Sequence, residues 1–207
     1  FLAIKPHIAL LWPLFLALTG RWRVFASAAV AVVVFAIAAG LIFGFETYAN
    51  WFESLDYSQR LISEQRITTP AYASLYANLL SVHAPQALAI GLHAASALAG
   101  VIIACVVFRR GDVMLGGAAL CAATLLVSPY LFFYDFTTLL VGAALLGAPR
   151  SPLDYAAAIF AWGASLSVAL GQIIVLPICP LAAWLVLGAT FMRARSAAPH
   201  EAPALQP

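Results

Sequence analysis

Charge is the scarcest property of this 207-residue sequence, since only 9% of its residues are Asp, Glu, Lys or Arg while 64% are hydrophobic. A soluble domain usually carries about 25% charged residues, which cover its surface. Ten basic and eight acidic residues are too few to do so here, so the composition excludes a soluble, disordered or coiled-coil protein. A net charge of +2 on scattered positions also excludes a nucleic-acid-binding surface. The composition therefore indicates an integral membrane protein.

Cysteine is rare as well. Cys105, Cys121 and Cys179 each lie in an apolar run, with no CxxC pair and no histidine at metal-ligand spacing. We therefore predict buried cysteines, and neither a metal nor a cofactor is indicated. His83 and His93 stand in apolar surroundings, so they are predicted to be packed or interfacial and not ligands. The chain also lacks HExxH, GxSxG and P-loop motifs, so no catalytic set is complete within it.

Long uncharged runs are what the sequence has in abundance. A membrane-spanning helix needs about 20 apolar residues at a rise of about 1.5 Å each. Pro129 divides the stretch 113–149, and Gly171-Gln172 with Pro177 divides the uncharged run 155–192, because proline cannot continue a helix. We predict an all-α transmembrane bundle over residues 1–192 and a disordered cytoplasmic tail over 193–207. The bundle has about seven spans, the first truncated: 1–18, 24–45, 86–108, 113–130, 131–149, 154–171 and 176–192.

The basic residues predict the orientation of the spans, because cytoplasmic loops are enriched in Lys and Arg. If the turn at Arg21 is cytoplasmic, seven of the ten basic residues lie inside and three lie outside. The inside residues are Arg21, Arg23, Arg109, Arg110, Arg150, Arg193 and Arg195, and the outside residues are Lys5, Arg60 and Arg66. The loop 46–85 is then periplasmic or extracellular, and the C-terminus is cytoplasmic.

The outer loop 46–85 has helical periodicity in two stretches. Aromatic and aliphatic residues recur every three to four positions between Tyr48 and Ile62, and again between Tyr72 and Leu80. Two amphipathic helices in the outer membrane interface fit this pattern. The alternative is an ordinary external loop folded against the bundle.

Ionisable and aromatic side chains gather on the predicted outer face: Lys5, His7, Arg60, Arg66, Tyr134 and Asp135. The stretch from Leu131 to Arg150 is only 20 residues long, so Asp135 is expected about one turn inside the outer boundary. A carboxylate at that depth needs a partner. Lys5 and His7 are the nearest candidates by side and depth. The cluster is either an ion pair that joins two helices or a substrate site.

Several short motifs resemble those of the glycosyltransferase family 87 membrane enzymes. The first is the run Lys5-Pro6-His7, followed by Leu11-Trp12-Pro13 and Arg21-Trp22-Arg23. The Phe43-Gly44 turn, the segment from Pro70 to Leu80, and Ser128-Pro129-Tyr130 through Tyr134-Asp135 resemble later parts of the family. The resemblance runs in order over residues 1 to about 192, and its specificity lies in the order and spacing of short motifs.

This resemblance implies a GT-C-type enzyme that transfers a hexosyl unit, with mannose as the candidate sugar, from a polyprenyl-phosphate sugar. The acceptor would be a glycolipid or glycan on the outer face of the cytoplasmic (inner) membrane. The family's general base is an Asp of the first external loop, which would precede Phe1. We therefore expect this chain to be the C-terminal portion of a longer enzyme, inactive alone. Lys5, Arg60 and Arg66 would contact the donor phosphate, and Asp135 would orient Lys5 or His7 or contact the sugar.

A transporter or permease subunit is the alternative function, and an inactive membrane scaffold is a third. Transporters place ionisable groups near the membrane midplane, on discontinuous helices arranged in repeats. The middle of every span predicted here lacks charge, and the sequence shows no internal repeat. The enzyme is therefore the preferred hypothesis, and the sequence encoded before Phe1 would discriminate between the three.

Overall fold

The computed structural model describes residues 6–9, 11–63, 73–110, 112–170 and 178–196, and all regular elements in these ranges are helices. The prediction of an all-α protein is confirmed. In chain order the helices are α1 (Pro6–Ala9), α2 (Leu11–Leu18), α3 (Trp22–Phe43), α4 (Glu46–Ser63), α5 (Leu75–Ser81), α6 (Gln86–Arg110), α7 (Val113–Val127), the short 3-10 helix η2 (Phe133–Phe136), α8 (Thr137–Leu146), α9 (Pro152–Leu170) and α10 (Ile178–Ser196).

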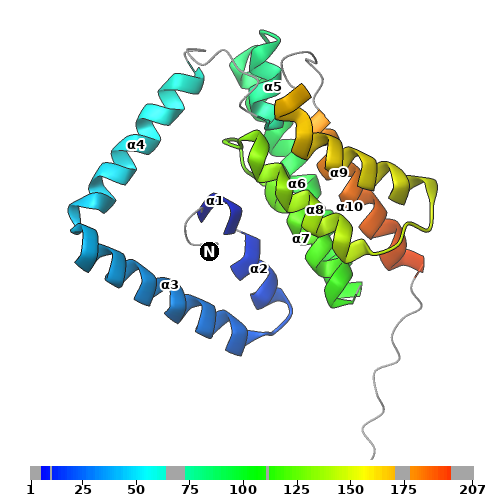
Figure 1. Cartoon of the computed structure of the whole chain (residues 1–207), viewed down its shortest axis with the longest axis horizontal. Coiled ribbons are helices and arrows are strands. Elements are labelled where there is room, and N and C mark those ends of the chain that lie inside the picture. Colours follow the sequence, from blue (N-terminus) through cyan, green and yellow to red (C-terminus); the bar gives the residue numbers. More distant parts are fainter. Residues whose placement is uncertain (1–5, 10, 64–72, 111, 171–177, 197–207) are drawn as a thin grey trace, which may run out of the picture.

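Helices α6 to α10 form a bundle around α7 (Figure 1). Helix α7 contacts α6, α8 and α10, and most of its residues are buried. Many of these residues are alanines, which allow neighbouring backbones to approach closely, as is common between membrane helices. Gly142 of α8 lies at one such approach, because a Cβ there would be 3.3 Å from the Cβ of Cys121.

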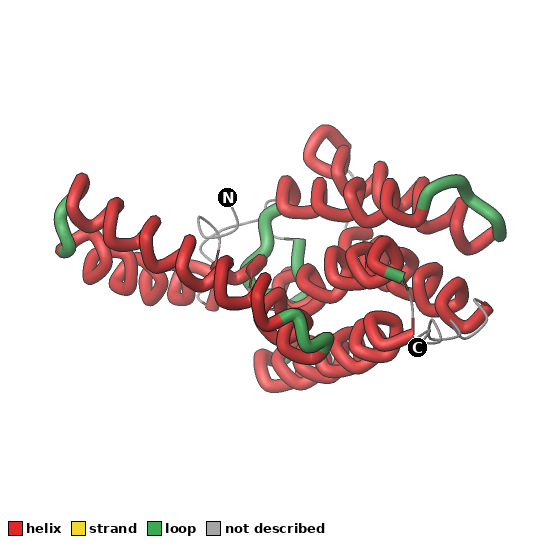
Figure 2. The backbone as a smooth tube through the Cα atoms, turned by 90° about the horizontal axis from the view of Figure 1, so that it is seen from below, coloured by secondary structure: helices red, strands yellow, loops and turns green. Residues whose placement is uncertain are grey.

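Helices α3 and α4 form an arm beside the bundle, which Figures 1 and 2 show from two directions. The corner of the arm lies at Gly44, whose φ of +85° favours glycine. Phe45 folds back onto Gly40, where a Cβ would be 2.6 Å from the ring, and the Tyr48 hydroxyl donates to the Ala36 carbonyl at 2.5 Å. These contacts fix the direction in which α4 leaves α3.

Three of the described helices are long and apolar enough to cross a membrane: α3, α6 and α10. Only 6% of the apolar window of α3 is buried, so its surface is suited to lipid. Helices α7 and α8 are apolar but shorter. With the apolar runs of α2 and α9, these helices indicate a multi-pass membrane protein, as predicted.

Two of the predicted spans differ in detail from the helices. The span 131–149 is η2 followed by α8, which begins only at Thr137, because the chain after Pro129 forms a turn before it resumes a helix. The span 1–18 contains α1 and α2. The predicted break at Pro129 is confirmed, since α7 ends at Val127. Helix α10 continues to Ser196, so the first four residues of the predicted tail 193–207 are helical. The break at 171–177, the helix boundary near Tyr72 and the rest of the tail, 197–207, lie outside the described residues.

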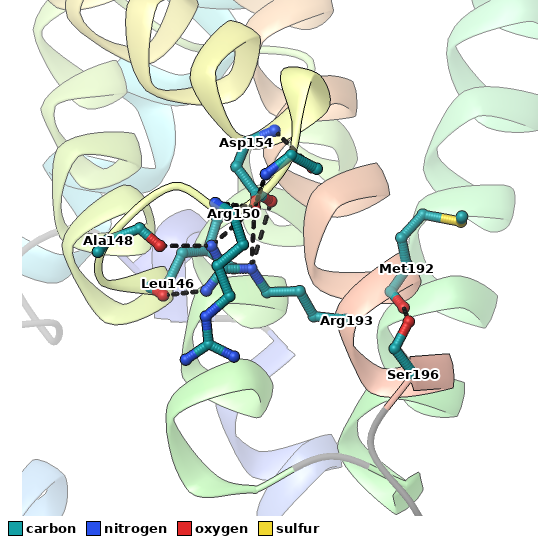
Figure 3. A network of polar contacts seen from close by, with 8 residues as sticks. Leu146, Ala148, Arg150, Asp154, Met192, Arg193 and Ser196 are labelled. Atoms are coloured by element: carbon teal, nitrogen blue, oxygen red, sulfur yellow. Dashed lines mark hydrogen bonds and ion pairs between the residues drawn. The ribbon is translucent and has the colours of Figure 1, made fainter.

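An ion pair joins three helix ends at one end of the bundle (Figure 3). Nη2 of Arg193 on α10 lies 2.8 Å from Oδ2 of Asp154, in the first turn of α9. The same guanidinium donates to the carbonyl of Leu146, the last residue of α8, and to the carbonyl of Ala148, two residues later. Asp154 in turn accepts from the backbone N–H groups of Arg150 at 2.8 Å and Ser151 at 3.0 Å. We call these residues the Arg193 clamp.

Candidate functional site

The other end of the bundle, opposite the Arg193 clamp, carries α5, the start of α6, the end of α7 and η2 (Figure 1). We call it the α5 end. Ser74, which is 1% exposed, connects its segments: its hydroxyl donates to the Pro129 carbonyl at 2.6 Å and accepts from the N–H of Ala77 at 3.1 Å. The second bond caps the N-terminus of α5. The N–H of Ala73 also donates to the Leu131 carbonyl at 2.8 Å.

Helix α5 is docked on α6 by its apolar side. Tyr76 and Leu80 are buried there with Ala89, in a small apolar cluster that is separate from the main core. In contrast, the aromatic residues Trp51, Phe52 and Tyr57 of α4 are exposed. Of the two helices predicted within the outer loop, α5 is thus folded against the bundle, while α4 presents its rings outward.

Asp135 is buried at the α5 end, with 4% of its surface exposed. It lies in η2, and its Oδ2 accepts from the backbone N–H of Phe132 at 3.0 Å. The N–H of Asp135 donates to the Phe132 carbonyl, also at 3.0 Å. The carboxylate therefore holds the turn that precedes α8. Asp135 itself lies before the first residue of α8 and not within that helix.

The turn held by Asp135 presents an aromatic pair. The rings of Phe132 and Tyr134 are stacked with centroids 5.3 Å apart and planes 4° from parallel. Tyr134 is 44% exposed, whereas the next ring along the chain, Phe136, is buried in the core. Tyr134 and Asp135 are thus adjacent in sequence but face different surroundings, one accessible and one enclosed.

The predicted basic residues are described only in part. Lys5 and Arg66 lie outside the described residues. His7 lies in α1, which contacts α7, and its side chain is not described. Arg60 lies in the last turn of α4 and is exposed. Helix α4, which carries Arg60, belongs to the arm, whereas Asp135 lies in η2 of the bundle. The structure therefore describes Tyr134 and Asp135 together at the α5 end. The predicted pairing of Asp135 with Lys5 or His7 stays a prediction.

His93 is packed within the bundle, as predicted. It is 8% exposed on α6, and its Nε2 lies 3.2 Å from the carbonyl oxygen of Val127, the last residue of α7. The Tyr76 ring makes an edge contact with it, with ring centroids 6.4 Å apart. Within the described ranges no three His, Cys, Asp or Glu residues are grouped as metal ligands. Among the cysteines, Cys121 and Cys179 are buried and Cys105 is partly exposed.

Sequence reasoning missed three polar residues at this end: Ser74, Thr124 and Ser128. All three are almost fully buried. Ser74 is marked by its place before an apolar helical run, which is the usual position of an N-cap. Thr124 and Ser128 are four residues apart in an otherwise apolar run, so they share a helix face, and that spacing is the signal that was available.

The model of glycosyltransferase family 87 matches residues 1–129, more than half of the chain. Tyr134 and Asp135 lie beyond that match. No curated protein and no solved structure matches the chain. The family match agrees with the apolar helical bundle described above, and it decides between enzyme and transporter. The chain belongs to glycosyltransferase family 87, and it is therefore a membrane glycosyltransferase or part of one.

Proposed function

We propose that this protein transfers a hexosyl unit, with mannose as the first sugar to test, from a polyprenyl-phosphate sugar to a glycolipid or glycan. The observation that carries the proposal is the family match over residues 1–129. A lipid-linked donor suits a protein whose helix α3 is almost wholly exposed along its apolar length, because the polyprenyl chain and the helix share the same bilayer.

The proposed donor site is at the α5 end, on the outer face of the cytoplasmic membrane. Tyr134 offers an exposed ring there, and Asp135 holds the turn that carries it. Lys5, His7, Arg60 and Arg66 are proposed to supply the positive charge that a phosphate requires. The family resemblance implies a general base in an external loop before Phe1, so only binding and positioning roles are proposed for residues 1–207.

Transfer can be tested with the full-length protein in lipid vesicles. Polyprenyl-phosphate mannose with a radiolabelled sugar is supplied together with a membrane glycolipid extract, and label in the glycolipid fraction is measured over time. We expect label to appear only with protein present. A parallel reaction with polyprenyl-phosphate glucose reports the choice of sugar. If protein whose thermal unfolding curve shows that it is folded transferred sugar from neither donor, the result would contradict the proposal.

A further inference from the structure

Three buried polar atoms in the seam between α6 and α7 have no hydrogen-bond partner among the described residues. They are Nδ1 of His93, Oγ1 of Thr124 and Oγ of Ser128. Their residues are 8%, 2% and 3% exposed. Buried polar groups in folded proteins are nearly always paired, and an unpaired one lowers stability. Three such atoms in one small region therefore require an explanation beyond packing.

His93 and Ser128 are neighbours at the α5 end, and Thr124 lies about one helical turn before Ser128. Thr124 is in α7 and Ser128 is its C-cap, four positions later, so both lie on the same side of the end of the helix. The His93 ring is bonded to the carbonyl of Val127, which is covalently joined to Ser128, so the ring lies beside Ser128. The site is within about two turns of the start of α6, since His93 follows Gln86 by seven residues.

The hydrogen bond to Val127 determines what His93 offers to a ligand. A carbonyl oxygen only accepts, so Nε2 must carry the hydrogen of that bond. In the neutral ring Nδ1 is then a bare acceptor, which needs a hydroxyl or N–H donor. Thr124 and Ser128 each bring a hydroxyl that both donates and accepts. Together the three atoms match neutral hydroxyl groups and provide no positive charge for a phosphate.

From this arrangement we infer that the α6–α7 seam binds hydroxyl groups of the hexosyl unit of the lipid-linked sugar. The inference rests on the proposed function and adds the residues that recognise the sugar, as distinct from those that hold the phosphate. His93, Thr124 and Ser128 are binding residues, and the unpaired atoms are satisfied when the sugar is present.

Helix α5 packs beside His93. Its Tyr76 ring makes an edge contact with the His93 ring, with centroids 6.4 Å apart, and the helix packs on a cluster separate from the main core. The seven-residue helix ends at Ser81, and two residues later His83 adopts a φ of +61°, a conformation that side-chain-bearing residues rarely occupy.

Two variants separate a binding role from a structural one. Thr124→Val and Ser128→Ala each remove a buried hydroxyl with little change in shape. Removal of an unpaired hydroxyl leaves the ligand-free melting temperature unchanged or higher. Loss of one neutral hydrogen bond to the sugar weakens binding roughly three- to tenfold. If removing a hydroxyl raises the stability of the protein and lowers its affinity for the sugar-bearing lipid, that hydroxyl has a binding role.

The measurement is binding of polyprenyl-phosphate mannose to the full-length protein in nanodiscs, with sugar-free polyprenyl phosphate as the second probe. We expect both variants to bind the sugar-bearing lipid more weakly and the sugar-free lipid as wild type does. Thr190→Val is the matched control, because Thr190 is also fully buried but its hydroxyl donates to the Leu187 carbonyl at 2.6 Å. That control should lose stability and retain affinity for both lipids.

The outcomes that overturn the inference differ from those that overturn the proposed function. Wild-type affinity of both variants for the sugar-bearing lipid would show that the hydroxyls are structural or hold only water, and transfer by the wild type would stand. If wild-type protein bound the two lipids equally and transferred no sugar from either hexose donor, the proposed function and this inference would both fail.

Discussion

Arg193 and Asp154 meet across the ends of α10 and α9, with Nη2 2.8 Å from Oδ2, and neither side chain is more than 12% exposed. The pair is 39 residues apart in sequence, and it also engages the backbone at the end of α8. One guanidinium thus satisfies a carboxylate and two carbonyls that would otherwise be left at helix ends. The clamp couples the last three helices of the bundle into one unit.

We expect Arg193→Lys to lower the stability of the protein markedly. Lysine keeps the charge but has no planar fork to reach Asp154, Leu146 and Ala148 together. A hydrogen bond made by a charged group contributes about 1.5–3 kcal/mol, and the substitution loses those to the two carbonyls. The fall is measured as the melting temperature of the purified protein in detergent. Arg195→Lys is the matched control, since Arg195 is exposed and lies over the Phe191 ring. Equal effects of the two substitutions would contradict the role given to Arg193.

Ser74→Ala is expected to release α5 from the bundle. The variant loses both the N-cap of α5 and the bond to Pro129, and loss of such a cap alone costs about 1 kcal/mol. Hydrogen exchange at residues 75–81 should increase more than exchange elsewhere in the bundle. Ser81→Ala is the control, because Ser81 is exposed and bonds only to Asn78 within the same helix. Uniform exchange across α5 and α6 would show that Ser74 does not anchor the helix.

Membrane topology is a third prediction, based on the seven-to-three distribution of basic residues. In a variant with the three native cysteines replaced by alanine, Ser58→Cys should react with a membrane-impermeant thiol reagent in intact cells. Ser196→Cys should react only after the membrane is permeabilised. The reverse pattern would invert the orientation and place the α5 end in the cytoplasm.

Much of the fold is predictable because it follows from composition along the chain. The uncharged runs predict where the helices lie, and Pro129 predicts where α7 ends. The Arg193 clamp was not predictable, because two of its acceptors are carbonyls of Leu146 and Ala148, and no side chain in the sequence marks them. The docking of α5 through Tyr76 was also hidden, since the same apolar periodicity fits a membrane interface and a protein surface.

The site was predicted in part for a related reason. Counting residues back from Arg150 predicts that Asp135 lies near the membrane boundary, and the structure adds that its side chain is buried within the protein. Counting did not show that the chain turns after Pro129, so the role of the carboxylate in holding η2 was missed. The seam at His93 depends on how α6 and α7 pair, which a single sequence does not specify.

Asp135 is the subject of the last prediction, which compares two substitutions. Asp135→Asn retains a side-chain oxygen that can accept from the Phe132 N–H, so the turn and the melting temperature should be preserved. Asp135→Ala removes this acceptor and should lower the melting temperature. If the negative charge orients a cation or the sugar in the transfer reaction, the Asn variant should still lose most of its activity, roughly tenfold or more.

The melting temperature and the transfer rate are measured on the same purified full-length variants, so that activity is expressed per folded molecule. A stable Asn variant with low transfer assigns the charge to the reaction, through a positioning role at the turn that carries Tyr134. Rate constants measured at saturating donor separate this role from donor binding, because a positioning defect lowers kcat whereas a lost binding contact raises KM. Wild-type transfer by the Asn variant would instead restrict Asp135 to holding the turn between α7 and α8.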